Sequence, residues 1–159
     1  MAAINADKDV MEFFKSTATL EQTTTFIKRM QQLFERKEYC YFAVDKLENK
    51  ELIGFIGLSE PNYVAPFTPC VDIGWRLKKS QWNQGFATEG ALQCLDYGFN
   101  QLKLERIFAT APLVNRKSQH IMVKIGMTRK YDFQHPLLLD NQRLKNCVLF
   151  EKTQVNLEI

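Results

Sequence analysis

The sequence predicts one domain with a mixed α/β fold. Some segments carry apolar residues at helical spacing, others are rich in branched and aromatic residues, and the two kinds alternate along the chain. The chain has 159 residues, 45% of them apolar and 25% charged, which suits one packed core. We therefore expect residues 1–159 to form a single domain.

The first half predicts a long helix followed by a hairpin. Apolar residues recur at helical spacing over residues 20–37, and Thr19 with Gln22 has the pattern of a capping box. Residues 39–47 and 51–59 are rich in aromatic and branched side chains, and the polar residues between them indicate a β-hairpin. Prolines between positions 61 and 69 then indicate a loop.

The second half predicts two strand-helix units and two closing strands. Candidate strands are residues 70–77, 106–111, 128–133 and 147–152. The helix after the first of them has an apolar face, formed by Ala91, Leu92, Leu95, Phe99 and Leu102. Asn115 can cap a short helix through Ile125, and Gly126 can close it.

Composition and charge narrow the class of protein. The net charge is +3 and the Lys and Arg residues are scattered, which argues against a specific nucleic-acid partner. The four cysteines lie far apart without a CxxC pair, so we expect free thiols and no metal site. Charges near the N-terminus and the lack of a long apolar run predict a cytoplasmic protein without a membrane segment.

A glycine turn between a strand and a helix is the first candidate binding site. The amides from Gln84 to Thr88 can point at one anion, with the helix dipole behind them. Gly85 and Ala87 are small enough to let that anion approach the backbone. No Gly-Lys-Ser/Thr follows and no GxGxxG is present, which argues against a P-loop and a Rossmann site. Taken alone, such a turn is more often an ordinary connection.

Several motifs in order give the turn its meaning. They are Ile73-Gly74-Trp75-Arg76-Leu77, Gln81-Trp82-Asn83-Gln84-Gly85-Phe86-Ala87-Thr88-Glu89, Leu104-Glu105-Arg106-Ile107, Asn115-Arg116-Lys117-Ser118 and Lys124-Ile125-Gly126-Met127. From about Asn5 to Phe150 the chain resembles the GNAT superfamily of acetyl-CoA-dependent N-acetyltransferases. It is most similar to the branch of ribosomal-protein N-terminal (alanine/serine) acetyltransferases, which share Trp-x-Gln-Gly-x-Ala-Thr-Glu and Asn-x-x-Ser.

The resemblance implies a fold and a cosubstrate, acetyl-CoA. The implied fold is a mostly antiparallel sheet of about six strands with about four helices, splayed between the strands that end near Leu77 and Ala111. The resemblance implies that the backbone of Trp75, Arg76 and Leu77 pairs with pantetheine and that Asn115 contacts the cofactor arm. It also implies that backbone amides hold the pyrophosphate, and these belong to Gln84, Gly85, Phe86, Ala87 and Thr88.

The proton-transfer residues are less clearly indicated. Where relatives often carry a Tyr as general acid, this chain has Met122, whose thioether cannot donate a proton. Ser118 is our hypothesis for the acid at the leaving thiolate, and the alternative is a solvated serine in the first helical turn. Asp72 is the first candidate for the base, and the alternative is a surface charge paired with a Lys or Arg. An α-amine, with a pKa near ~8, needs less help from a base than a Lys near ~10.4.

Other side chains are weaker candidates. Glu60 and His135 lie in predicted loops, and His120 lies on the short helix, where a His usually faces solvent. A group of aromatic side chains could line an acceptor pocket, although packing in the core is the better interpretation. The group consists of Phe55, Tyr63, Phe67, Trp75 and Trp82.

The resulting functional prediction is direct transfer of acetyl to a primary amine, a protein N-terminus or a small molecule, in a ternary complex without a covalent enzyme intermediate. The alternative is a non-catalytic CoA-binding or regulatory module, and transfer of a longer acyl group also stays open. Relatives usually begin with a strand that precedes the segment Asn5-Ala6-Asp7 and is missing here. We expect the open sheet edge to be covered by a partner subunit, as in a homodimer, or by another segment, unless the recorded start is too late.

Overall fold

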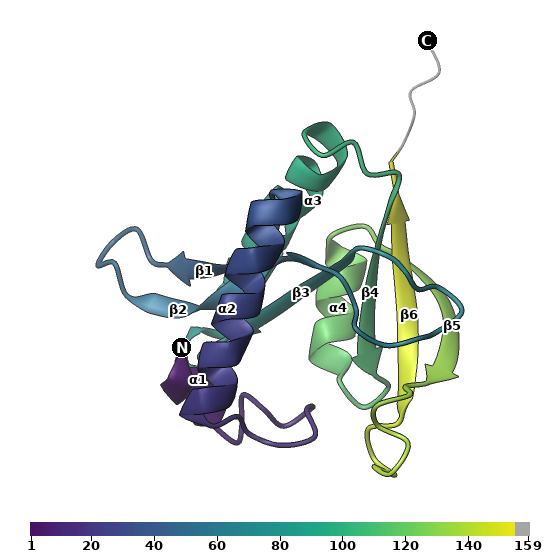
Figure 1. Ribbon diagram of the computed structural model, residues 1–159, viewed down its shortest axis with the longest axis horizontal. Helices are drawn as coiled ribbons and strands as arrows, with labels where there is room; N and C mark the ends of the chain where they lie inside the picture. Colours follow the sequence, from purple (N-terminus) through teal and green to yellow (C-terminus); the bar gives the residue numbers. More distant parts are fainter. Residues whose placement is uncertain (155–159) are drawn as a thin grey trace.

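A six-stranded sheet forms the centre of the computed structural model, which describes residues 1–154 (Figure 1). The strands are β1 (Tyr41–Asp45), β2 (Leu52–Ser59), β3 (Asp72–Leu77), β4 (Arg106–Pro112), β5 (Thr128–Gln134) and β6 (Asn146–Thr153). Their order in the sheet is β1-β2-β3-β4-β6-β5, and every neighbouring pair is antiparallel except β3 and β4. The predicted mixed, mostly antiparallel sheet is confirmed.

Helices cover both faces of this sheet. They are α1 (Ala2–Ala6), α2 (Leu20–Lys37), α3 (Phe86–Asn100) and α4 (Arg116–Lys124), with a short 3-10 helix, η1 (Lys79–Gln81). On α2, Phe26 packs against Phe55, with 5.1 Å between the ring centroids. On α3, Gly90 faces Ile56, whose side chain points to the other side of β2. Thus α2 lies in front of the sheet in Figure 1 and α3 lies behind it.

The ends of the helices follow the local chemistry of the sequence. The Thr19 hydroxyl accepts from the Gln22 amide at 3.2 Å, and the Gln22 side chain accepts from the Thr19 amide at 2.9 Å, so the predicted capping box is present. Asn115 caps α4 by accepting from the Ser118 amide. Gly126 follows that helix with a φ of 80°. These three predictions are confirmed.

The predicted inner face of α3 is wrong in two places. Leu92 is 44% exposed, and Leu102 lies beyond the end of the helix at Asn100. The buried residues of α3 are instead Ala91, Leu95, Gly98 and Phe99. Gly98 was missed because it has no apolar side chain to indicate a buried face. The absence of that side chain lets Ile107 approach the helix.

The sheet opens between its two central strands. Within residues 1–154, β3 and β4 share one pair, Asp72 with Phe108. Beyond it β3 stays paired with β2 as far as Leu77, while β4 stays paired with β6 as far as Pro112. The predicted splay between these strands is confirmed.

The two outer strands of the described sheet are β1 and β5. Residues 2–6 form α1 and lie in no strand, so the outer side of β1 has no partner strand within the described residues. The prediction that another segment or a second subunit covers this edge stays a prediction. In the part of the chain that the structure describes, no helix combines the length and the apolar character that crossing a membrane requires.

Candidate active site

A cavity of about 1020 Å³ occupies the splay between β3 and β4. Its walls come from both strands, from the first turns of α3 and α4, and from the loops around residues 9–15 and 135–138. Asp72 and Ser118 both line it. So do Trp75, Arg76, Leu77, Gly85, Phe86, Ala87, Thr88 and Asn115. The one predicted site residue outside this lining is Gln84, whose side-chain amide donates to the Ser80 carbonyl at 2.8 Å.

The start of α3 forms an amide cradle on one wall. Gly85 is the N-cap, with a left-handed φ of 87°, and Asn83 is also left-handed at 60°. The first intrahelical bond here runs from the Glu89 amide to the Gly85 carbonyl, so the amides of residues 86–88 have no acceptor within the helix. A side chain built on Gly85 would meet no atom within 4 Å. The cradle is therefore open to an anionic ligand.

Trp82 holds this cradle against the end of β3. Its indole nitrogen donates to the Leu77 carbonyl at 2.9 Å. The Lys117 ammonium lies 4.7 Å from the centre of a Trp82 ring, so it carries a positive charge from α4 toward the cradle. Neither contact follows from sequence spacing, because each joins residues on different elements.

The edge of β3 that faces the splay is available for backbone pairing. On its other side β3 is fully paired with β2, from Asp72 with Ser59 to Leu77 with Gly54. Toward β4 its residues after Asp72 have no strand partner within residues 1–154. An extended amide-bearing ligand in the splay can therefore bond to this edge as an added strand does.

Asp72 lies where the two strands begin to separate. The Tyr41 hydroxyl donates to its Oδ1 at 3.1 Å, and no ion pair within the described residues includes it. Burial raises the pKa of Asp72 to about 7, against the smaller lowering effects of the Tyr41 hydrogen bond and of the Arg29 charge. The alternative of a surface charge paired with a Lys or Arg is wrong.

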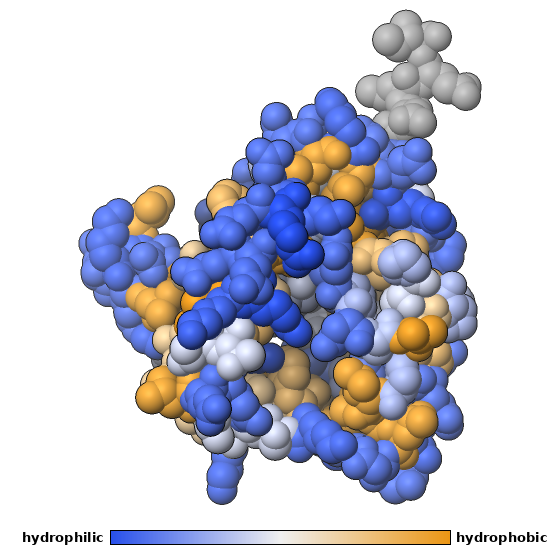
Figure 2. Space-filling model, in the orientation of Figure 1, coloured by the Kyte–Doolittle hydropathy of each residue, from blue (hydrophilic) through white to orange (hydrophobic). Residues whose placement is uncertain are grey.

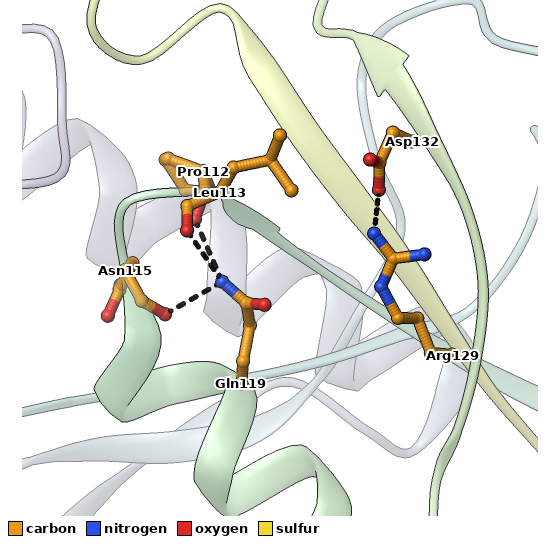
Figure 3. A network of polar contacts seen from close by, with 6 residues as sticks. All are labelled: Pro112, Leu113, Asn115, Gln119, Arg129 and Asp132. Carbon is orange, nitrogen blue, oxygen red and sulfur yellow. Dashed lines mark hydrogen bonds and ion pairs between the residues drawn. The ribbon is translucent and has the colours of Figure 1, made fainter.

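Ser118 is held by the residue that caps its helix. The Asn115 side-chain nitrogen donates to the Ser118 Oγ at 3.1 Å, so the hydroxyl keeps its own proton for another acceptor. The Gln119 amide binds the loop before α4, reaching the carbonyls of Leu113 at 3.0 Å, Asn115 at 3.3 Å and Pro112 at 3.4 Å (Figure 3). Gln119 was missed in the sequence because these contacts depend on the path of the loop.

The weaker candidates lie in different surroundings. Glu60 is exposed, accepts from the Tyr39 hydroxyl at 2.7 Å and lies outside the cavity lining. His120 and His135 both line the cavity. The His135 ring lies 4.3 Å from that of Tyr63, its Nδ1 accepts from the Leu137 amide, and burial lowers its pKa. Within residues 1–154 no group of three or more His, Cys, Asp or Glu is placed to hold a metal ion.

The aromatic group predicted as core or pocket serves as both. Phe55 is 4% exposed and still borders the cavity, as do Tyr63, Trp75 and Trp82. Phe67 lies outside the lining and packs on Phe133, with 5.1 Å between the ring centroids. Figure 2 shows the face of the molecule that α2 covers, which is hydrophilic over the helix and has apolar patches around it.

The fold is that of the GNAT acetyltransferases. Residues 1–128 match the acetyltransferase (GNAT) domain family, so the chain belongs to it. The chain is 29% identical over 122 residues to the uncharacterized N-acetyltransferase YoaA of Bacillus subtilis (strain 168), covering 74% of this chain and 67% of that protein.

Solved structures agree with the family. A GNAT acetyltransferase from Bacillus anthracis superposes with a TM-score of 0.77 at 28% identity, covering 96% of this chain and 86% of that one. The spermidine N-acetyltransferase from Vibrio cholerae, in complex with CoA and spermine, superposes with a TM-score of 0.74 at 19% identity, covering 96% of this chain and 87% of that one. The ribosomal-protein-S5-alanine acetyltransferase from Vibrio fischeri superposes with a TM-score of 0.70 at 20% identity, covering 87% of this chain and 74% of that one. These last two show a shared fold.

Proposed function

We propose that this chain transfers an acetyl group from acetyl-CoA directly to a primary amine, either a protein N-terminus or a small molecule, within a ternary complex. Membership of the GNAT family supports acetyl transfer. The observation that carries the finer proposal is the placement of Asp72, Ser118 and the amide cradle around one cavity. A proton acceptor for the amine, a proton donor for the departing thiolate and an anion site for the cosubstrate would then serve one reaction.

The backbone is proposed to bind the cosubstrate. The amides of residues 86–88 fit a pyrophosphate at the start of α3, with the Lys117 charge nearby. The free edge of β3, at Trp75, Arg76 and Leu77, fits the amides of pantetheine. Asn115 borders the same cavity and holds Ser118 toward it.

Asp72 and Ser118 are proposed to move the protons. The Asp72 carboxylate takes a proton from the acceptor ammonium, which frees the nitrogen lone pair to attack the thioester carbonyl. The new C–N bond forms and the C–S bond breaks, and the Ser118 hydroxyl gives its proton to the departing sulfur. The proton still in excess on the nitrogen leaves through solvent and restores the serine, so the net products are an amide, a thiol and one proton.

Direct transfer is supported by the state of the cysteine at the cavity. Cys147 borders it but is 1% exposed, and burial raises the pKa of its thiol to about 11. Its Sγ lies 3.4 Å from the Leu144 carbonyl, where a protonated thiol is the favourable partner. A neutral buried thiol is a poor nucleophile, so an acyl-cysteine intermediate is disfavoured.

The test is release of free thiol from acetyl-CoA in the presence of small amines and peptides with free N-termini, followed by mass spectrometry of the acceptor. We expect thiol release that depends on the amine. Tight CoA binding without release across the panel would instead support a non-catalytic CoA-binding module.

Ser118→Ala tests the proposed acid. We expect kcat to fall at least about tenfold, because an unassisted thiolate leaves less readily. Ser16→Ala is the matched control, since Ser16 is exposed and lies outside the cavity lining. A kcat for Ser118→Ala within about twofold of the wild type would remove Ser118 from the mechanism.

A further inference from the structure

One cavity residue, Arg76, carries a charge that has no part in the proposed acetyl transfer. Arg76 lies four residues after Asp72 on β3, so both side chains project from the same face of the strand, the face that α2 covers. The intervening position on that face is Gly74, where the Tyr41 ring fills the space. Asp72 and Arg76 thus mark two ends of a wall of the cavity whose middle is aromatic.

The Arg76 guanidinium lies close to two aromatic rings. Its Cζ lies 4.1 Å from the ring centre of Phe14 and 5.0 Å from that of Phe55. Nη1 donates to the Asn5 side-chain oxygen at 2.8 Å, and Nε is buried without a hydrogen-bond partner among the described residues. The ring contacts and the hydrogen bond to Asn5 position the group, and that bond uses one of its five N–H donors.

Arg76 has no carboxylate partner within the described residues. Within residues 1–154, three acidic side chains line the cavity: Glu12 is paired with Arg143 at 2.7 Å, Asp9 is paired with Lys79 at 2.8 Å, and Asp72 is the proposed base. Burial without a counter-charge lowers the pKa of Arg76 to about 10. A desolvated cation without an anion costs stability, which an anionic ligand group offsets.

We propose that the acceptor is a primary amine that also carries a carboxylate, with Arg76 binding the carboxylate while the amine lies at Asp72. This inference rests on the proposed acetyl transfer. A guanidinium is the side chain best suited to a carboxylate, because its parallel N–H groups match the two oxygens. The Cα atoms of Asp72 and Arg76 are roughly 13 Å apart along an extended strand. An acceptor that reaches both side chains must therefore carry its amine and its carboxylate several bonds apart.

The competing interpretation gives Arg76 a purely structural role, as a link between β3 and Asn5 of α1. If the role of Arg76 is structural, its substitution should lower the activity toward every acceptor equally. If Arg76 binds a carboxylate, the substitution should lower the activity only toward acceptors that carry a carboxylate.

The experiment compares matched acceptors. γ-Aminobutyrate and ε-aminocaproate are set against butylamine and hexylamine, and the dipeptide amide Ala-Asp against Ala-Asn. We expect kcat/KM to favour the carboxylate-bearing member of a pair at least about tenfold, which corresponds to one charge-assisted interaction. A preference confined to the amino acids indicates a small-molecule acceptor, and one confined to the dipeptides indicates an N-terminus near an acidic side chain.

Variants assign the preference to Arg76. Arg76→Gln should abolish the preference for the carboxylate-bearing acceptor, and Arg76→Lys should keep part of it. Asn5→Ala should retain it, since this change removes the hydrogen bonds of Asn5 to Arg76 and Thr23 but keeps the guanidinium. Arg36→Gln is the charge-matched control, because Arg36 is exposed on α2 and, among the described residues, the one hydrogen bond of its side chain goes to the Gln32 carbonyl of its own helix. Equal activity toward both members of every pair, or an equal loss for both in Arg76→Gln, would overturn the proposal.

Failure of the proposed acetyl transfer is distinguishable from failure of this inference. If no amine in the panel is acetylated, calorimetry on the CoA-saturated protein measures binding of ε-aminocaproate and hexylamine directly. Binding of ε-aminocaproate at least about tenfold tighter, lost in Arg76→Gln, supports the carboxylate site without catalysis. Equal binding of the two ligands refutes it.

Discussion

Burial raises the pKa of Asp72, the proposed base, and the hydrogen bond from Tyr41 partly offsets that rise. Because an ionised carboxylate is needed to accept a proton, we expect kcat/KM to rise with pH through an apparent pKa of about 7. Asp72→Asn should remove this acidic limb. Tyr41→Phe should move the limb to higher pH, since the hydrogen bond from Tyr41 lowers the pKa of Asp72. A pH-rate profile of Asp72→Asn that keeps the wild-type limb would assign the base elsewhere, with His135 as the next cavity residue to test.

The same carboxyl makes stability depend on pH. Its pKa is 3.8 as an ordinary value and about 7 in the folded chain. Between these two pH values the Asp72 carboxyl is ionised in the unfolded chain but keeps its proton in the folded chain. The contribution of Asp72 to the free energy of unfolding is therefore lost as pH rises, and it is fully lost above about pH 7. Asp72→Asn should therefore gain stability relative to wild type as pH rises. Because Asp72 is partly exposed, we expect about 1–3 kcal/mol between about pH 4 and about pH 8, measured by urea unfolding.

At the scale of single residues, local patterns were predictable and distant partners were not. Asn115 and Ser118 lie within one helical turn, so their contact follows from spacing. Tyr41 and Asp72 are 31 positions apart and lie on β1 and β3. Their contact depends on how three strands register, and on two glycines that leave space for the Tyr41 ring and the chain beside it. No sequence spacing contains that information.

Among the elements, the turn into α3 offers a test of the cradle. Gly85→Ala places a side chain where φ is 87°, which costs about 1 kcal/mol of stability. Its Cβ meets no protein atom but lies in the space proposed for the pyrophosphate, so the KM for acetyl-CoA should also rise. Gly126→Ala is the control, with a φ of 80° at a position outside the cavity lining. An equal rise of KM in both variants would argue against the cradle.

The boundaries of the elements were largely predictable because caps and turns are local. The paired contacts of Thr19 and Gln22 are examples. The inner face of α3 was less predictable, since Gly98 is buried there by the approach of Ile107 from another element. The wall built by Phe14 and Arg76 was unpredictable for the same reason, because a loop before α2 packs onto β3.

Binding of CoA should stabilise the whole molecule against unfolding. CoA at about a hundred times its Kd adds roughly 2.7 kcal/mol to the free energy of unfolding. For a chain of this size that corresponds to a rise in Tm of roughly 5–10 °C, measured by calorimetry. Adenosine alone, which lacks the pyrophosphate and pantetheine, should produce a much smaller rise. Equal effects of the two ligands would contradict pairing of pantetheine with β3.

The single pair between Asp72 and Phe108 also has a mechanical consequence. On either side of it lie two half-sheets, β1-β2-β3 and β4-β6-β5, each held together by its own antiparallel strand pairs. A small rotation of one half-sheet against the other changes the width of the slot while every other strand pair survives. We therefore expect the largest acyl group that the cavity can hold to depend on this rotation as well as on the side chains that line it.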